Sequence, residues 1–256
     1  MARRTSSVVE TVLTLVYAVL IALGIRTIAF EPFNIPSGSM KPTLLVGDYL
    51  FVSKYSFGYS RHSLPYPLPW LAAPIFHGRL FGALPARGDV AVFKQPSDTS
   101  IDYIKRIVGL PGDRVQMKEG LLHINGSPVP RQDAGNYLDV DRGSRTLVKR
   151  YIETLPPARE GQPARVHDIL KHSDHEWLDN TEEYRVPEGH VFAMGDNRDN
   201  SQDSRVASAV GFIPVENLVG RAEFIFFSID TEVARWLEPW EWPFLIRWSR
   251  LIKGIT

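Results

Sequence analysis

The sequence predicts a mainly antiparallel β protein preceded by one apolar N-terminal helix. A hydrophobic run occupies residues 8–30, whereas the rest of the chain consists of short alternating runs separated by turn dipeptides. No long amphipathic pattern follows residue 30, and 19 prolines and 19 glycines are spread through the chain. Many short strands joined by turns account for this composition better than long helices do.

The N-terminal run has the composition of a membrane anchor. Its uncharged part, residues 11–25, would span about 22 Å as a helix, which is less than the roughly 30 Å hydrocarbon core. Glu10 and Arg26 should therefore lie near the two membrane interfaces. Two arginines precede the run, which predicts a cytoplasmic N-terminus (residues 1–7), a single transmembrane helix (residues 8–30) and a remainder outside the cytoplasm.

Two other interpretations of this run remain open. The small residues of Ala22-Leu23-Gly24 would suit the cleavage site of a signal peptide. A helix buried in the protein core would have a similar composition.

Turn dipeptides mark the expected strands. Gly-Asp precedes three runs of strand composition, and Asn125-Gly126 has the signature of a type I′ hairpin turn. The strands expected from these turns and from alternation are residues 49–53, 90–93, 103–108, 114–117, 121–124, 127–129 and 219–229.

Charge and cysteine content exclude several kinds of site. Lys plus Arg and Asp plus Glu both number 29, so net charge gives no reason to expect nucleic acid as a partner. The chain has no cysteine, which excludes disulfides, thiolate metal sites and a cysteine nucleophile.

Two segments have a composition that suits either a membrane surface or the protein core. Residues 58–87 are rich in proline, aromatic and aliphatic residues and carry little charge. Residues 231–256 interleave tryptophans with basic residues, a pattern that favours lipid headgroups. These side chains are Trp236, Trp240, Trp242, Trp248, Arg247, Arg250 and Lys253.

Three segments carry residues suited to chemistry. Around Ser37 and Ser39, prolines and a glycine predict a rigid irregular loop, in which a nucleophilic serine could be held but which is also common in plain turns. In the strand expected at 103–108, Lys105 shares a face with Tyr103 and Ile107, so burial could lower its pKa enough for it to act as a base. Without further context, a surface lysine beside a surface arginine is an equally simple interpretation of these residues.

The third segment, residues 194–205, is dense in Asp, Asn, Ser and Arg. It lacks the glycine and glutamate spacing of an EF-hand loop. Arg198 and Arg205 among the carboxylates favour an internal ion-pair network over a metal site.

Taken together and in this order, residues 35–44, 103–113 and 195–205 resemble the signature segments of bacterial type I signal peptidases, also called leader peptidases. Residues 47–52 and 87–93 resemble the strands between them, so the likeness covers about half of the chain. The resemblance implies a mainly antiparallel β catalytic domain (residues 31–114 and 190–230) with an inserted β-rich region (residues 115–189).

The resemblance also implies the roles of individual residues. Ser39 would be the nucleophile and Lys105 the general base of a serine–lysine dyad. Ser37 would contribute to the oxyanion hole, Ser201 would hold the Lys105 amine, and Asp203 with Arg205 would brace the site. Shallow pockets for small side chains would be lined by Phe33, Ile35, Met40, Leu44, Tyr103 and Ile104.

A protein of this family would remove signal peptides from secretory preproteins after a small-x-small motif, without metal or cofactor. We accordingly expect a monomeric inner-membrane protein that contacts lipid, spans once and carries its catalytic domain on the periplasmic side. Better-known members often have two transmembrane segments, whereas one is visible here, and residues 58–87 are longer than a minimal core needs. These departures affect topology and membrane docking but no catalytic position.

Other hydrolases fit the sequence less well. A Ser-His-Asp enzyme of the α/β-hydrolase type would need a Gly-x-Ser-x-Gly elbow, which is absent, although His190 lies close before the third segment. A penicillin-binding enzyme needs Ser-x-x-Lys on a helix, but Lys41 follows Ser39 one residue too early and precedes a proline.

Three further classes remain as alternatives. A metalloenzyme would draw on His167, His172, His175 and Glu176, yet no His-Glu-x-x-His motif is formed. A membrane-tethered binding protein would not need the catalytic set, and a self-cleaving repressor would carry a DNA-binding domain in place of the apolar run.

Overall fold

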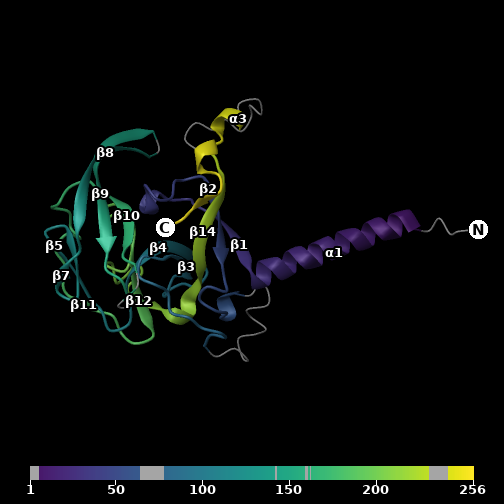
Figure 1. The fold of residues 1–256 in the computed structure, drawn as a ribbon, viewed down its shortest axis with the longest axis horizontal. Coiled ribbons are helices and arrows are strands. Elements are labelled where there is room, and N and C mark those ends of the chain that lie inside the picture. Colours follow the sequence, from purple (N-terminus) through teal and green to yellow (C-terminus); the bar gives the residue numbers. More distant parts are fainter. Residues whose placement is uncertain (1–5, 64–77, 142, 159–160, 162, 231–241) are drawn as a thin grey trace, which may run out of the picture.

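A computed structural model describes residues 6–63, 78–141, 143–158, 161, 163–230 and 242–256. The described chain is mainly antiparallel β, with one long N-terminal helix, which confirms the predicted fold class (Figure 1).

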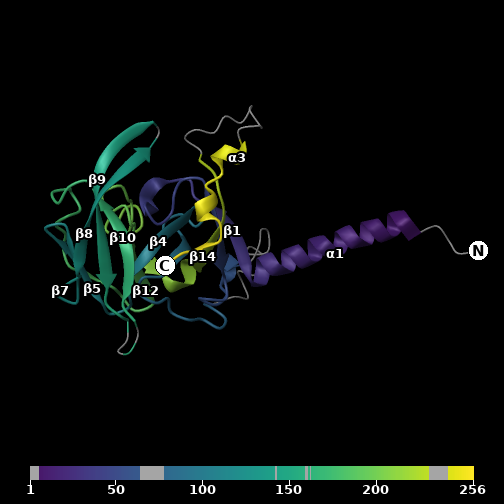
Figure 2. The same cartoon turned by 45° about the horizontal axis from the view of Figure 1, so that its top comes forward.

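Helix α1 (Ser6–Ile28) projects from the β-rich body in both views (Figures 1 and 2). Its apolar stretch Val9–Ile28 has a mean hydropathy of 2.0, and none of that stretch is buried inside the protein. The interpretation of this run as a buried core helix is therefore wrong. By length and composition, α1 could cross a membrane.

The first sheet has eight strands, all paired antiparallel, in the order β1-β2-β14-β3-β4-β12-β13, with β15 paired to β14. Its strands are β1 (Phe30–Asn34), β2 (Asp48–Ser53), β3 (Val90–Lys94), β4 (Asp102–Gly109), β12 (His190–Met194), β13 (Ile213–Pro214), β14 (Leu218–Ser228) and β15 (Lys253–Gly254). Segments from both halves of the chain thus interleave in one sheet.

The intervening chain forms two smaller antiparallel sheets, which lie at the end of the body opposite α1 (Figures 1 and 2). One has the order β10-β9-β8 and the other the order β11-β5-β6-β7. Their strands are β5 (Arg114–Lys118), β6 (Leu121–Ile124), β7 (Ser127–Pro128), β8 (Arg131–Asp141), β9 (Ser144–Leu155), β10 (Arg165–Lys171) and β11 (Tyr184–Arg185).

The central strand β3 is buried on both faces, which shows that the large sheet is covered on both sides. Val90 and Val92 pack in one apolar cluster, whereas Ala91 and Phe93 pack in another. This is the arrangement expected when successive side chains point to opposite faces of a strand.

Every strand expected from the sequence is present, with bounds shifted by no more than about one residue, as is usual for strand ends. The turn between β6 and β7 has positive φ at both central residues, 54° at Asn125 and 82° at Gly126. Both values fit the predicted type I′ turn.

Five short helical segments complete the described chain: η1 (Gly38–Met40), η2 (Arg61–Ser63), η3 (Val215–Asn217), α3 (Trp242–Leu245) and η5 (Trp248–Arg250). Beyond η5, β15 returns the C-terminus to the large sheet. Trp248 is 63% exposed. Trp236 and Trp240, to which the membrane-contact hypothesis also referred, lie outside the described residues.

The segment 58–87 is described only at its two ends. Tyr59 and Leu80 pair as an isolated bridge, which closes the base of the segment. Just beyond it, Phe81 is 87% exposed. The described ends thus contain a backbone bridge and an exposed aromatic side chain. Residues 64–77 lie outside the described chain.

Candidate active site

The fold brings Ser39 and Lys105 into direct contact. Ser39 lies in the short helix η1, and Lys105 lies on β4, 66 residues later. The Nζ of Lys105 is 2.6 Å from the Oγ of Ser39 and 3.1 Å from the carbonyl oxygen of Ile104. Both side chains are buried, so a hydroxyl and an amine meet in a site with little water.

Burial changes the acidity of the amine. Desolvation lowers the pKa of Lys105 from 10.5 to about 8, an effect that Asp203 and Asp196 oppose and Arg205 reinforces. Loss of hydration disfavours the ammonium form more than the nearby carboxylates favour it. About a tenth of this lysine is therefore neutral at pH 7, which makes it available as a general base.

Backbone contacts hold the loop that carries Ser39. The amide of Asn197 donates to the carbonyl oxygen of Ser39 at 3.0 Å, and its side-chain amide donates to that of Gly38 at 3.2 Å. Gly195 lies so close that a Cβ there would be 2.6 Å from the Ser39 carbonyl oxygen and 2.3 Å from the Oγ of Ser201. The third sequence segment thus packs against the serine loop, and glycine is required at the point of closest approach.

A buried ion pair ties the same loop to the smaller sheets. The Nζ of Lys41 donates to Asp139 at 2.7 Å and to the carbonyl oxygen of Val140 at 2.6 Å. Lys41 is only 5% exposed. The loop therefore has a fixed position relative to β8.

The two other serines of the predicted site lie beside the dyad. The Oγ of Ser37 is 3.4 Å from the Oγ of Ser39, at the outer limit of a hydrogen bond. The Oγ of Ser201 is buried, and it is one of the groups that lower the pKa of Asp203. The structure thus brings Ser201 to the site but does not bond it to Lys105, whose amine is directed at Ser39 and Ile104.

Asp203 and Arg205 form the ion pair expected from the sequence. A guanidinium nitrogen of Arg205 lies 2.7 Å from Asp203 and also donates to the carbonyl oxygen of Arg198 at 2.6 Å. The amide of Gly195 donates to Asp203 at 3.0 Å. Although burial alone would raise the pKa of Asp203, the charge of Arg205 and the hydrogen bond from Gly195 hold it below its usual value.

Sequence reasoning missed a second buried charge cluster behind the serine loop. Arg106, next to Lys105 on β4, makes two hydrogen bonds to Asp196 at 2.8 and 2.7 Å. Arg198 makes a two-point contact with Glu153 of β9. The density of charged residues in 194–205 predicted an ion-pair network. No local pattern could indicate that Arg198 would pair with Glu153, 45 residues away in the sequence.

His167 of β10 lies between the two carboxylates of this cluster. Its Nε2 is 3.5 Å from Glu153 and 3.9 Å from Asp196, and neither ring nitrogen has a hydrogen-bond partner among the described residues. Burial and then the charge of Arg106 lower its pKa to about 4, so the ring is neutral at physiological pH. His167 therefore fills the space between charged groups without adding charge.

The dyad opens onto a cleft of about 970 Å³. Four of the predicted pocket residues line it: Phe33, Ile35, Tyr103 and Ile104. Met40 and Leu44, which were assigned to the same pockets, do not. Both are fully buried in the apolar cluster beneath β1 and β2, because their side chains point away from the cleft into the core.

The histidine-based alternatives find no geometric support in the described part of the chain. No histidine there makes a hydrogen bond or ion pair with Ser39, and the Nδ1 of His190 contacts the carbonyl oxygen of Glu188 instead. No group of three or more His, Cys, Asp or Glu side chains in those residues is arranged to hold a metal ion.

Comparison with known proteins assigns the family. The family model for signal peptidase, peptidase S26, matches residues 8–227. The chain belongs to the signal peptidase family. It is 40% identical to signal peptidase I of Rickettsia typhi over 93% of this chain and 90% of that protein. It is 42% identical to signal peptidase I of Rickettsia conorii over 86% of this chain and 79% of that protein.

A solved structure of signal peptidase I from Enterococcus faecalis is 23% identical in sequence to this chain, with a TM-score of 0.30. The match covers 54% of this chain and 97% of the Enterococcus faecalis chain. Family membership rests on the family model and the sequence relatives. It implies a serine peptidase that processes signal peptides, and it separates this chain from penicillin-binding enzymes and self-cleaving repressors.

Proposed function

We propose that this protein is a membrane-anchored endopeptidase in which Ser39 attacks the substrate and Lys105 is the general base. The observation that carries the proposal is the 2.6 Å contact between the Nζ of a buried lysine and the Oγ of a buried serine. A serine hydroxyl is a weak nucleophile on its own and needs an adjacent base to accept its proton. Lys105 meets that need because its pKa is about 8.

In the reactive state the Lys105 amine is neutral and accepts the hydroxyl proton as the Oγ of Ser39 attacks the scissile carbonyl carbon. The resulting ammonium then gives this proton to the leaving amine, which becomes the new N-terminus of the mature protein. Water, deprotonated by the same amine, cleaves the acyl-enzyme and restores the free serine.

Donors beside Ser39 would stabilise the negative charge that develops on the substrate oxygen. Ser37 faces the cleft next to Ser39, so its hydroxyl and the Ser39 amide can point to the same oxygen. Asp203 accepts the amide of Gly195, and Arg205 donates to the carbonyl oxygen of Arg198. These two hydrogen bonds would keep the loop beside Ser39 in place. We assign Ser201 the role of holding the Lys105 amine, since its buried hydroxyl lies beside the same cleft.

The substrate side of the proposal follows from the cleft. Phe33, Ile35, Tyr103 and Ile104 provide a shallow apolar lining next to Ser39, which suits small side chains before the cut bond. The expected substrates are secretory preproteins with a small-x-small motif. Helix α1 would hold enzyme and membrane-bound substrate at one surface and so raise their effective concentration. We place the N-terminus in the cytoplasm and the β body on the periplasmic side, following the positive-inside rule.

Purified full-length protein in detergent should cut a secretory preprotein just after a small-x-small motif, as sequencing of the new N-terminus would reveal. Ser39→Ala and Lys105→Ala should each abolish the cut while the protein remains folded. Matched changes at exposed positions, Ser100→Ala and Lys118→Ala, should leave it unchanged. Near-full activity in either dyad variant would refute the proposed mechanism.

A further inference from the structure

Trp177 is an exposed aromatic residue on the same cleft as the dyad. Its side chain is 70% exposed, although an indole ring of this size is usually packed against something. It lines the cleft together with Ser39 and Ser201. We infer that Trp177 contacts the mature part of the substrate, that is, the residues on the carboxyl side of the cut bond. This inference rests on the proposed function.

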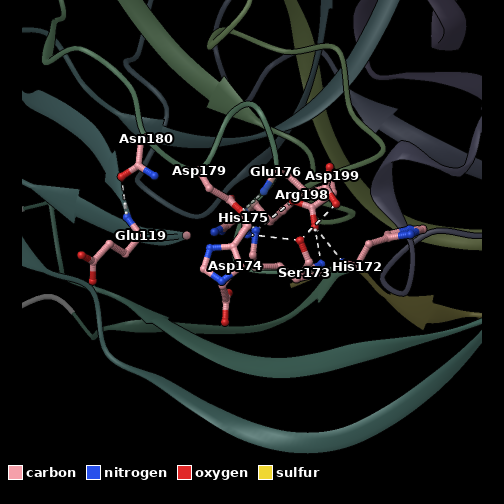
Figure 3. A network of polar contacts seen from close by, with 12 residues as sticks. Glu119, His172, Ser173, Asp174, His175, Glu176, Asp179, Asn180, Arg198 and Asp199 are labelled. Atoms are coloured by element: carbon pink, nitrogen blue, oxygen red, sulfur yellow. Dashed lines mark hydrogen bonds and ion pairs between the residues drawn. The ribbon is translucent and has the colours of Figure 1, made fainter.

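The loop that carries Trp177, residues 172–180, is fixed by buried charges (Figure 3). Lys171 is 1% exposed, and its Nζ lies 2.6 Å from Asp179 and 2.8 Å from Asp199. Asp199 also accepts the backbone amide of His172 at 2.7 Å. One end of the loop is thereby attached to the segment that carries Ser201, two residues after Asp199.

The other end of the loop is attached just as firmly. Asp179 accepts the amide of Glu176 at 2.8 Å, which closes a turn around Trp177 itself. Asn180 accepts the amide of Glu119 at 3.0 Å, as the contact at the edge of Figure 3 shows. The backbone on both sides of the tryptophan is thus held before any ligand arrives. A partner that covers the ring loses little conformational entropy of the loop, which favours binding.

The position of the loop indicates which part of the substrate it meets. The signal-peptide side of the cleft is formed by β1 and β4, and β1 follows α1 after a single residue. Trp177 comes instead from the inserted chain, whose sheets lie at the end of the body opposite α1 (Figures 1 and 2). A substrate whose signal peptide stays beside α1 in the membrane must leave Ser39 in the direction of the inserted sheets.

Other groups on this side of the cleft also suit a peptide. Asn200 and Gln202 are exposed and line the same cleft as Trp177, so they can exchange hydrogen bonds with a peptide backbone. An apolar ring and amide side chains in one cleft would accept mature N-termini of varied sequence. Continuity with the catalytic cleft favours the substrate over an unrelated partner as the occupant of this surface.

The test compares two peptide substrates in detergent with full-length protein. Both contain the same signal-side sequence, but one ends a single residue after the cut bond and the other continues for several residues of mature sequence. Trp177→Ala should lower kcat/KM for the extended peptide by about tenfold, a typical loss for a buried aromatic contact, and leave the short peptide unaffected. Trp177→Phe should recover most of the loss, because the phenyl ring retains part of the apolar contact.

Leu147→Ala is the matched control, because Leu147 is 66% exposed on β9 of the same inserted region and does not line the cleft. Thermal melting of each variant checks that the fold is retained, and Trp177→Gln provides a second variant with a polar side chain. Equal losses on both peptides, or no loss on either, would overturn the inference. A loss seen only with preprotein in lipid vesicles would assign Trp177 to the membrane and also overturn it. If the wild-type protein cut neither peptide, the proposed function itself would fail.

Discussion

Cleavage by this protein should depend on pH through Lys105. Only the neutral amine can accept the Ser39 proton, so kcat/KM should rise with pH and level off above the pKa of about 8. Burial sets this pKa, because a side chain that is only 3% exposed loses most of the hydration that would stabilise its ammonium form. The pH profile therefore reports directly on the desolvation of the dyad.

The size of the effect follows from the two pKa values. With a pKa of about 8, about a tenth of Lys105 is neutral at pH 7, whereas with the ordinary value of 10.5 the neutral fraction would be about 0.03%. Burial thus increases the active fraction about 300-fold at neutral pH. Below the pKa, kcat/KM should fall about tenfold for each pH unit.

The assay is kcat/KM for a signal-side peptide in detergent, measured from about pH 6 to about pH 10. Half-buried His62 and buried His167 do not complicate this range, since the pKa values of both are lowered to about 4. Lys105→Arg serves as a control that retains the positive charge but cannot lose its proton, and it should be inactive at every pH.

A midpoint near the ordinary histidine value of about 6.5 would refute this reasoning, because it would assign the base to a different side chain. A profile that stays flat to pH 10 would do the same. A profile that is still rising steeply at about pH 10 would preserve the dyad but show that burial does not tune the pKa of Lys105.

Three further predictions concern stability. Because the pKa of Lys105 is lower in the folded state, the protein should lose stability as pH falls from about 10.5 to about 8. Lys105→Met removes this cost and should raise the free energy of unfolding at pH 7 by up to about 3 kcal/mol, as measured in urea titrations. His167 likewise has a lowered pKa, so the stability of the wild-type protein should fall as pH drops from about 6.5 to about 4. His167→Gln should reduce this pH dependence of the melting temperature. An unchanged pH dependence in the variant would contradict the prediction. Glu153→Gln leaves the buried Arg198 guanidinium without its anion and should cost about 3–5 kcal/mol by chemical denaturation, whereas removal of the exposed pair partner by Asp168→Asn should cost less than about 1 kcal/mol.

Local pattern accounts for most of the secondary structure of this chain. The apolar run predicted α1, and alternation with Gly-Asp and Asn-Gly turns predicted the strands, because helix and strand periods and turn conformations depend on neighbouring residues. The pairing of Asp203 with Arg205 was also predictable, since the two residues are only two positions apart.

The order of the three segments pointed to Ser39 and Lys105, but sequence could not place one beside the other. Their contact depends on the antiparallel pairing of β4 with β3 and on the closure of the serine loop by Asn197. The sequence also assigned Met40 and Leu44 to the pockets, because it could not tell which way side chains of an irregular loop would point. In the folded protein their apolar surface is removed from water in the core instead.

By itself, the sequence determined one apolar helix, a β body and the residue types that the proposed serine–lysine mechanism needs. Tertiary structure alone decided which groups are buried together. The lowered pKa of Lys105, the neutral His167 between two carboxylates and the exposed Trp177 all arise from contacts between distant strands and loops. Desolvation and Coulomb interactions depend on distance in space, and distance along the chain does not fix them.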